Sequence, residues 1–174
     1  MKPVVRFAGV RDLSRLAEIE NAADALLIEH LQPEEWPLAP DGIARASMGG
    51  FILVVATVED ADPVGFVHVL ESDGNAHLEQ LSVLPEHGRT GFGRTLVESA
   101  MEEAARRGYG SITLRTFATV PWNGPFYRSC GFVESQPESP FHCALEQAEI
   151  SAGLEKQGRR IQMTAQLSSP AASG

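Results

Sequence analysis

Cysteine is scarce in this chain of 174 residues, which contains only Cys130 and Cys143. Their separation matches neither a paired metal-ligand motif nor a disulfide-rich scaffold, and the histidines also lack ligand spacing, so we expect no metal site. No apolar run approaches the length of a membrane span. The first residues lack the apolar stretch of a secretory signal. We therefore expect a cytoplasmic protein.

Positive charge is also in short supply. Fourteen Lys and Arg stand against 23 Asp and Glu, which gives a formal net charge of −9. Nucleic-acid binding draws most of its affinity from cations that neutralise phosphates, so this balance argues against a nucleic acid as partner. An acidic field favours a cationic amine, although an ordinary acidic surface accounts for the same number.

The chain has enough apolar material for one core, since hydrophobic residues make up 43% of its 174 positions. We expect a single domain over residues 1–167 and a disordered tail of small and polar residues over 168–174.

Hydrophobic periodicity predicts a chain of mixed strands and helices. An amphipathic helix of about three turns is expected after Asp12, and prolines make residues 24–48 less regular. Asp73-Gly74 predicts a hairpin turn. Further helices are expected over 91–107 and 140–157, and strands over 4–7, 51–56, 64–70, 77–83, 111–116 and 160–167.

The most informative stretch is residues 77–95, where a strand runs through a glycine-rich turn into a helix N-terminus. Gly88, Gly91 and Gly93 lie in this turn. Backbone N–H groups and the positive end of a helix dipole would then point at one spot, which is an arrangement that holds a phosphate without basic side chains.

Two nucleotide-binding motifs come close to this turn and fail. A P-loop needs Lys where Arg94 stands, and a planar guanidinium does not replace a compact ammonium. The dinucleotide fingerprint needs a third glycine where Leu96 stands. Plain turn chemistry remains an alternative for Gly91-Phe-Gly93, so a second motif is needed.

Residues 81–96 resemble the pyrophosphate loop of the GCN5-related N-acetyltransferases (GNAT): a strand ending in Val-x-Pro, a loop closing in Gly-x-Gly, then a helix. One position departs, because Gly88 stands where the family usually has Gln or Arg, with Arg89 one place later. Residues 121–132 resemble the second signature of the same family, in which Phe-Tyr on a short helix is followed after three residues by Gly-Phe. The resemblance covers about residues 4–134.

This resemblance implies an α+β fold with a central mixed sheet of about seven strands, antiparallel first and parallel at the cofactor cleft, with helices on both faces. It implies acetyl-CoA as cosubstrate. The pantetheine arm would bond the backbone of the central strand, and the phosphates would lie on the loop. The implied cofactor-binding residues are Leu81, Ser82, Val83, Arg89, Thr90, Gly91, Phe92, Gly93, Arg94 and Thr95. Asn123 either caps the short helix or touches the pantetheine arm, and capping is the favoured role.

The resemblance assigns Tyr127 as the acid that protonates the departing thiolate, against the alternative of a buried tyrosine with a satisfied hydroxyl. Attack by an amine also needs a base. His77 and Glu79 lie two apart on one strand, so their side chains leave the same face about 7 Å apart. Either one is a candidate base, and two solvated polar residues are the alternative.

In the family, the stretch over residues 24–48 forms one wall of the acceptor pocket. Its candidates for substrate contact are Glu29, His30, Glu34, Glu35 and Trp36. The predicted function is an N-acetyltransferase acting on a primary amine of a small molecule or peptide, by direct attack in a ternary complex. The alternative is a non-catalytic acyl-CoA-binding or sensor module of the same fold. A homodimer is left open.

Overall fold

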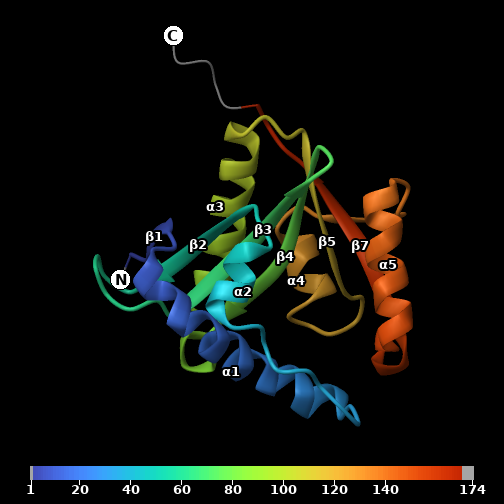
Figure 1. Ribbon diagram of the computed structural model, residues 1–174, viewed down its shortest axis with the longest axis horizontal. Helices are drawn as coiled ribbons and strands as arrows, with labels where there is room; N and C mark the ends of the chain where they lie inside the picture. The colour runs from blue at the N-terminus through green and yellow to red at the C-terminus, as the bar shows by residue number, and fades with distance from the viewer. Residues whose placement is uncertain (1, 170–174) are drawn as a thin grey trace. The chain divides into compact units, whose positions relative to one another are not determined.

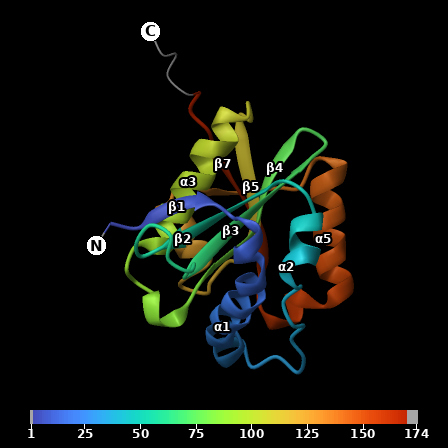
Figure 2. The same cartoon turned by 60° about the vertical axis from the view of Figure 1, so that its left-hand side comes forward.

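The structure is a computed structural model that describes residues 2–169 (Figures 1 and 2). Its strands are β1 (Val4–Phe7), β2 (Phe51–Ala56), β3 (Gly65–Ser72), β4 (Asn75–Val83), β5 (Ser111–Phe117), β6 (Val133–Ser135) and β7 (Arg160–Gln166). Its α-helices are α1 (Leu13–Leu31), α2 (Gly42–Ser47), α3 (Phe92–Arg106), α4 (Gly124–Ser129) and α5 (Pro140–Ala152).

The seven strands form one mixed sheet in the order β1-β2-β3-β4-β5-β7-β6. The pairs β1–β2, β2–β3, β5–β7 and β6–β7 are antiparallel, and β4 and β5 are parallel. A parallel pair needs a crossover between its strands, and α3 supplies it. The predicted α+β fold with a mixed seven-stranded sheet is therefore confirmed.

The chain divides into two compact units. Unit 1 contains the residues up to Glu71 together with Leu78–Ala100, and unit 2 contains Ser72–His77 together with the chain from Met101 onward. β4 therefore contributes its first residues to unit 2 and the rest to unit 1. A single domain over residues 1–167 stays a prediction.

Unit 1 has its core between α1 and the antiparallel strands. Leu16, Ile19, Val54, Phe66 and Leu84 pack together there, and all five are buried. α1 is longer than the predicted three turns. Its second half is rich in alanine and leucine, which are good helix formers. The helix ends at Leu31, and the next residue, Gln32, has a left-handed φ of 50°.

Close backbone contact brings α2 against α1 (Figures 1 and 2). A Cβ on Gly42 would lie 1.9 Å from the carbonyl oxygen of Leu13, so only glycine fits at the first residue of α2. The Asp41 side chain accepts the N–H of Ala44 at 2.8 Å and caps the helix. These two residues thereby set the direction of α2.

Unit 2 is built on the antiparallel strands β5, β7 and β6. The predicted alternation of the last strand is confirmed, because Ile161, Met163 and Ala165 are buried. β6 was not predicted, since three residues are too short for a periodic signal. The helix predicted over 140–157 divides into α5, which Ser139 caps, and a 3₁₀ turn over Leu154–Gln157.

Of the tail predicted over 168–174, residues 170–174 lie outside the described residues. Within residues 2–169, no helix combines the length and the apolar character that crossing a membrane requires. The same part of the chain contains no group of three or more His, Cys, Asp or Glu side chains arranged to hold a metal ion.

Candidate active site

The predicted glycine-rich loop joins β4 to α3 in unit 1. A 3₁₀ turn over Pro85–His87 follows the strand. The N–H of Thr95 donates to the carbonyl of Gly91 at 2.9 Å, which is the first i→i−4 bond of α3. The N–H groups of Phe92, Gly93 and Arg94 therefore precede the helical ladder. Together with the helix dipole, they form a site suited to a phosphate.

Glycine is required in this loop by backbone conformation. Gly91 has a φ of 88°, a left-handed value that strains other residues. No atom lies within 4 Å of the place where its Cβ would be, so the backbone is open to a ligand. Arg89 also has a positive φ, 58°. The open backbone and the helix N-terminus fit the pyrophosphate of a coenzyme A molecule.

Three of the other predicted loop residues, Thr90, Phe92 and Thr95, are engaged within the loop. The hydroxyls of Thr90 and Thr95 donate to the carbonyls of His87 and Gly91. Phe92 is buried, and its ring stacks on that of His87 with 5.8 Å between centroids. These three side chains hold the loop, so Thr90, Phe92 and Thr95 can offer a phosphate only their backbone groups.

In the predicted pantetheine-binding segment, Leu81, Ser82 and Val83, the side chain of Ser82 is engaged. Ser82 is buried, and its hydroxyl accepts from the Gln80 amide at 3.0 Å. A Cβ on Gly65 of β3 would lie 2.9 Å from the Ser82 carbonyl oxygen. Any contact with a pantetheine arm would therefore use the backbone, in keeping with the role that the resemblance implies.

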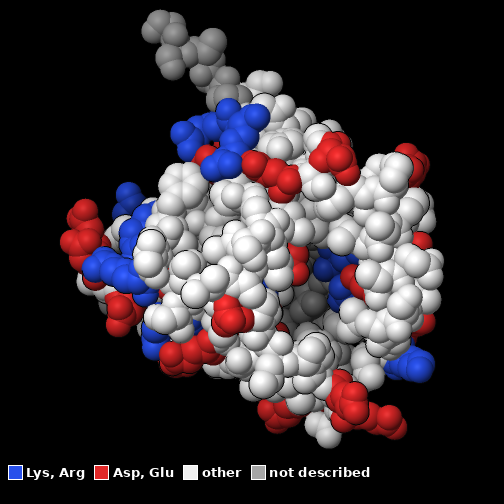
Figure 3. Space-filling model, in the orientation of Figure 1, with Lys and Arg blue, Asp and Glu red and all other residues white. Residues whose placement is uncertain are grey.

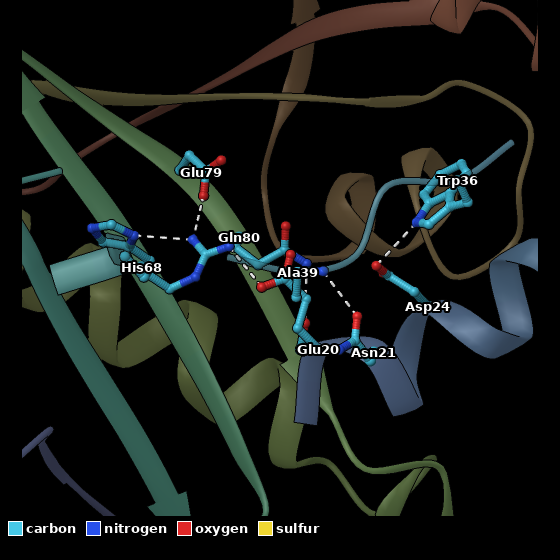
Figure 4. Close-up of polar contacts among 10 residues, drawn as sticks. Glu20, Asn21, Asp24, Trp36, Ala39, His68, Glu79 and Gln80 are labelled. Atoms are coloured by element: carbon cyan, nitrogen blue, oxygen red, sulfur yellow. Dashed lines mark hydrogen bonds and ion pairs between the residues drawn. The ribbon is translucent and has the colours of Figure 1, made fainter. Parts of the chain in front are cut away.

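Glu79 is held by a residue that the sequence did not single out, Arg45 of α2. Arg45 is 1% exposed. Its Nη1 donates to the Glu79 carboxylate at 2.6 Å, and its Nη2 donates to Glu20 at 2.6 Å. Figure 4 shows Glu20, His68 and Glu79 converging on this guanidinium. Glu79 is therefore a positioned carboxylate and not the freely solvated side chain of the alternative interpretation.

His68 completes this cluster as a neutral imidazole. Its Nδ1 lies 3.1 Å from Arg45 Nη1, which can only donate, so Nδ1 accepts. Its Nε2 lies 2.9 Å from the Gly49 carbonyl and donates to it. Burial lowers the pKa of His68, which agrees with an uncharged ring.

Two further carboxyl groups of α1 lie in this part of unit 1. Burial raises the pKa of Glu20 to about 7, against the opposing effect of Arg45. Burial also raises the pKa of Asp24, whose carboxylate accepts from the Trp36 indole at 3.1 Å. Glu20 and Glu79 thus share one buried guanidinium, and Asp24 is influenced by its charge without contacting it.

The Glu20 carboxyl should make stability depend on pH. The folded state binds its proton more tightly than the unfolded state, so the unfolding free energy should fall as the pH rises from 4.5 to about 7. The loss is on the order of 3 kcal/mol. Urea unfolding at pH 5 and pH 8 should show a smaller fall for Glu20→Gln than for the wild type.

The control for this experiment is Glu18→Gln, which changes an exposed glutamate of the same helix. It should keep the wild-type pH dependence. If the unfolding free energies of the wild type and Glu20→Gln fall equally with pH, Glu20 has the same pKa in the folded and unfolded states.

The predicted acceptor-contact residues differ in burial. Trp36 is half-buried against Asp24, whereas Glu29, His30, Glu34 and Glu35 are exposed. Trp36 is thereby tied to Asp24 of α1. The other four stay candidates.

His77, the other candidate base, belongs to unit 2 and is 3% exposed. Its Nδ1 lies 2.8 Å from the Thr113 hydroxyl. Burial lowers its pKa to about 4, helped by His142 and Arg115 and opposed by Glu149. The alternative interpretation of a solvated strand residue is therefore wrong for His77, because unit 2 encloses its ring.

Tyr127 lies on α4, also in unit 2, and is 8% exposed. Its ring packs edge-on against those of Phe126 and Phe132, with centroids 5.1 and 5.8 Å away. Burial, followed by Cys130, raises its pKa. Within residues 2–169 its hydroxyl has no hydrogen-bond partner, which is unlike a structural tyrosine with a satisfied hydroxyl. The phenol is protonated at neutral pH and can act as a donor.

Asn123 does not cap α4 through its side chain, and that expectation is wrong. It occupies the N-cap position, but its Oδ1 accepts from the Thr116 hydroxyl at 2.8 Å. The physical reason is the tight approach of α4 to the end of β5: a Cβ on Gly124 would lie 2.4 Å from the Ala118 carbonyl oxygen. This approach brings the Asn123 amide within reach of Thr116.

Sequence reasoning missed Arg45, Glu20, Thr113 and His142 as site residues. Thr113 and Arg115 are polar residues at alternate positions of a largely buried strand, which is a signal that could have marked this face of β5. Arg45 gives no comparable signal, because it lies 34 positions from Glu79.

The sequence and the fold are both similar to those of known acetyltransferases. Residues 14–132 match the sequence profile of the Acetyltransferase (GNAT) family. The fold is similar to that of the ribosomal-protein-S18-alanine N-acetyltransferase from Escherichia coli, with a TM-score of 0.67, 20% identity and 99% of each chain covered. It is also similar to PaiA N-acetyltransferase from Thermoplasma acidophilum in complex with coenzyme A, with a TM-score of 0.69 and 17% identity. The match covers 95% of this chain and 99% of that one.

A third similar structure is nourseothricin acetyltransferase, with a TM-score of 0.65 and 21% identity, over 97% of this chain and 100% of that one. The acceptors in these names differ, from an alanine of a ribosomal protein to nourseothricin.

Proposed function

Because the chain belongs to the GNAT acetyltransferase family, we propose that it transfers the acetyl group of acetyl-CoA to a primary amine of a small molecule or peptide. The amine would attack directly in a ternary complex. One observation carries this proposal: the loop with Gly91 at a φ of 88° leads into the N-terminal N–H groups of α3. That arrangement suits a pyrophosphate and needs no lysine.

Acetyl-CoA supplies an activated thioester when it is bound, and this chain supplies the loop donors and the proton donor. The residues that would hold the cosubstrate are the loop from Arg89 to Thr95 and the backbone of Leu81, Ser82 and Val83. Asn123, turned towards Thr116, remains a candidate contact. Tyr127 would donate a proton to the departing thiolate, which its raised pKa allows at neutral pH.

The acceptor must lose a proton before it can attack. An alkylamine with a pKa near 10.4 is mostly charged at pH 7, a penalty of roughly 4–5 kcal/mol. Glu79 is tied to Arg45, which suits it to hold a cationic amine in place. His77 has a nitrogen, Nε2, without a hydrogen bond in the described part of the chain, which suits it to take the proton.

The acceptor we propose is a cationic amine. In unit 1, the Arg45 guanidinium bonds two carboxyl groups, Glu20 and Glu79, and its charge acts on a third, Asp24. Basic side chains lie elsewhere as well, at the top and at the left-hand side of the view in Figure 3. At the end of α3, Arg106 and Arg107 pair with Glu103. A cytoplasmic location and a homodimer stay predictions.

A panel of amines tests this function through the release of free CoA from acetyl-CoA. Polyamines, aminoglycoside-like amines, amino acids and short peptides should be compared, and we expect turnover with at least one cationic amine. Binding of acetyl-CoA with no release of CoA from any acceptor would favour the non-catalytic acyl-CoA-binding module.

Paired substitutions separate the roles of His77 and Glu79. His77→Gln should lower kcat about ten- to hundredfold, at or below the low end of the range for acid–base catalysis, because the amine can also lose its proton to solvent unaided. Glu79→Gln should mainly raise KM, about tenfold, since a charge-assisted contact to the amine is lost. Steady-state kinetics with the best amine measure both.

Glu98→Gln is the control, because Glu98 is an exposed glutamate of α3. A fall in kcat for Glu79→Gln and not for His77→Gln would assign the base to Glu79. If His77 is the base, the pH profile should show no inflection near the ordinary imidazole value of about 6.5, because burial lowers the pKa of His77 to about 4.

A further inference from the structure

A continuous chain of hydrogen bonds leads from His77 to the N-terminus of α5. His77 Nδ1 lies 2.8 Å from the Thr113 hydroxyl, and the same hydroxyl lies 3.0 Å from His142 Nε2. His142 Nδ1 lies 2.6 Å from the Ser139 hydroxyl. All four residues belong to unit 2, and they are called the relay chain below: His77, Thr113, His142 and Ser139.

The relay chain runs from a buried end to an accessible one. His77 is 3% exposed and His142 9%, whereas Ser139 is only half-buried. Ser139 caps α5 by accepting the backbone N–H of His142 at 3.2 Å. The cap therefore holds the Ser139 hydroxyl next to the His142 ring. The proton of this hydroxyl can pass to solvent.

The hydrogen bonds of the relay chain can all point in one direction or all in the other. In one arrangement, His77 Nδ1–H donates to Thr113, Thr113 donates to His142 Nε2, and His142 Nδ1–H donates to Ser139. This leaves the lone pair of His77 Nε2 available. In the opposite arrangement every donor becomes an acceptor, and Nε2 carries the proton. Hydroxyl and imidazole groups each have a donor and an acceptor, so both arrangements are fully bonded.

We propose that the relay chain carries the proton of the acceptor amine from His77 Nε2 to solvent at Ser139. The inference rests on the acetyl transfer proposed above. His77 is the catalytic residue in it, and Thr113 and His142 are positioning residues that act through His77.

The proton transfer balances at every atom. The amine N–H bond breaks as the N–H bond at His77 Nε2 forms, and the Nδ1 proton moves to Thr113. The Thr113 proton moves to His142 Nε2, the Nδ1 proton of His142 moves to Ser139, and the Ser139 proton leaves to water. After product release, solvent takes the Nε2 proton and returns one through Ser139, which restores the first arrangement.

The surroundings of His77 explain why a relay is needed. His142 of α5, Arg115 of β5 and Glu149 of α5 are the titratable groups that influence it, and the Phe141 ring packs edge-on at 5.7 Å. An imidazolium is disfavoured here, since burial and the neighbouring cation both lower the pKa of His77. Burial and Arg115 also lower the pKa of His142. Neither His77 nor His142 is suited to hold an extra proton as an imidazolium. The proton taken from the amine must therefore be balanced by one that leaves along the relay chain.

Thr113→Val tests the relay with little change of shape. Loss of the hydroxyl should lower kcat about tenfold while KM for acetyl-CoA stays the same. Thr164→Val is the matched control, because Thr164 pairs directly opposite Thr113 on β7 and its hydroxyl bonds Ser135 instead. Thr113→Ser keeps a hydroxyl and should restore most of the rate, including where Thr113→Val folds poorly.

Solvent isotope effects distinguish proton transfer from simple packing. We expect the wild-type rate, plotted against the fraction of D₂O in the solvent, to fall below a straight line, because several protons move together. Thr113→Val should lose this curvature. Unchanged kcat and unchanged curvature in Thr113→Val, with an active wild type, would overturn the relay and leave the acetyl transfer standing.

A measurement without turnover tests the hydrogen-bond chain itself. The ¹⁵N shifts of the imidazole nitrogens should show His77 and His142 neutral between pH 6 and 8, with tautomers that change in Thr113→Val and persist in Thr164→Val. A charged His77 or His142 at pH 7 would overturn the relay. If no amine is acetylated by the wild type, the proposed function fails separately from this result.

Discussion

Replacing Tyr127 with phenylalanine should lower the rate of acetyl transfer by about 10²–10⁴, the range for one positioned acid catalyst. The substitution removes a hydroxyl that has no hydrogen-bond partner within residues 2–169, so no buried group is left unpaired. The ring contacts with Phe126 and Phe132 remain. Acetyl-CoA binding and the unfolding free energy should therefore stay close to the wild-type values while turnover collapses.

The acid role of Tyr127 also has a pH signature. Because burial raises its pKa above the ordinary value, the hydroxyl should keep its proton over the whole working range, and the rate should show no alkaline inflection from Tyr127. Single-turnover kinetics with a saturating amine measure the rate over pH 6–9.5. Tyr109→Phe removes the hydroxyl of the other tyrosine and is the control. Unchanged turnover in Tyr127→Phe would make Tyr127 a packing residue.

Gly91→Val should abolish the thermal stabilisation that acetyl-CoA gives to the wild type. A ligand at 100 times its Kd adds about 2.7 kcal/mol of stability, which corresponds to a rise in Tm of about 5–10 °C for a chain of this size. The valine side chain would project into the space left open at Gly91, and its backbone resists the φ of 88° found there. The side chain and the changed backbone should both prevent the phosphates from binding to the loop.

Thermal unfolding with and without acetyl-CoA measures this result. Each variant is compared with its own ligand-free Tm, so the strain of valine at a left-handed position is subtracted. Gly110→Val is the matched control, because Gly110 has equally open space and an ordinary φ, and it should keep the full shift. Gly93→Val places the same side chain next to the N-terminal N–H groups of α3. An unchanged Tm of the wild type with acetyl-CoA would contradict the cofactor assignment.

Local sequence determined the elements around the glycine-rich loop between β4 and α3. Alternation identified β4, helical spacing identified α3, and the glycines between them predicted the turn, because each of these signals lies within a few residues of the backbone it shapes. The same holds for the hairpin at Asp73 and Gly74, which have φ values of 51° and 78°. Family resemblance added Tyr127, which α4 carries as expected.

Only the tertiary structure decided which polar groups meet. Arg45 reaches Glu20 and Glu79 from 25 and 34 positions away, and His142 reaches Thr113 from 29. Periodicity cannot report such partners, since it records which face of an element is buried and nothing about what covers that face.

Burial then decided the chemistry of the two candidate bases. His77 and Glu79 are neighbours on one face of a strand by sequence, and the sequence treats them alike. In the fold, one is enclosed beside Thr113 with a pKa lowered to about 4, and the other is partly exposed and paired with Arg45. The sequence thus determined the strand, the loop and the family. The packing of α2 and α5 determined what His77 and Glu79 can do, because desolvation and hydrogen-bond partners arise only when distant segments come together.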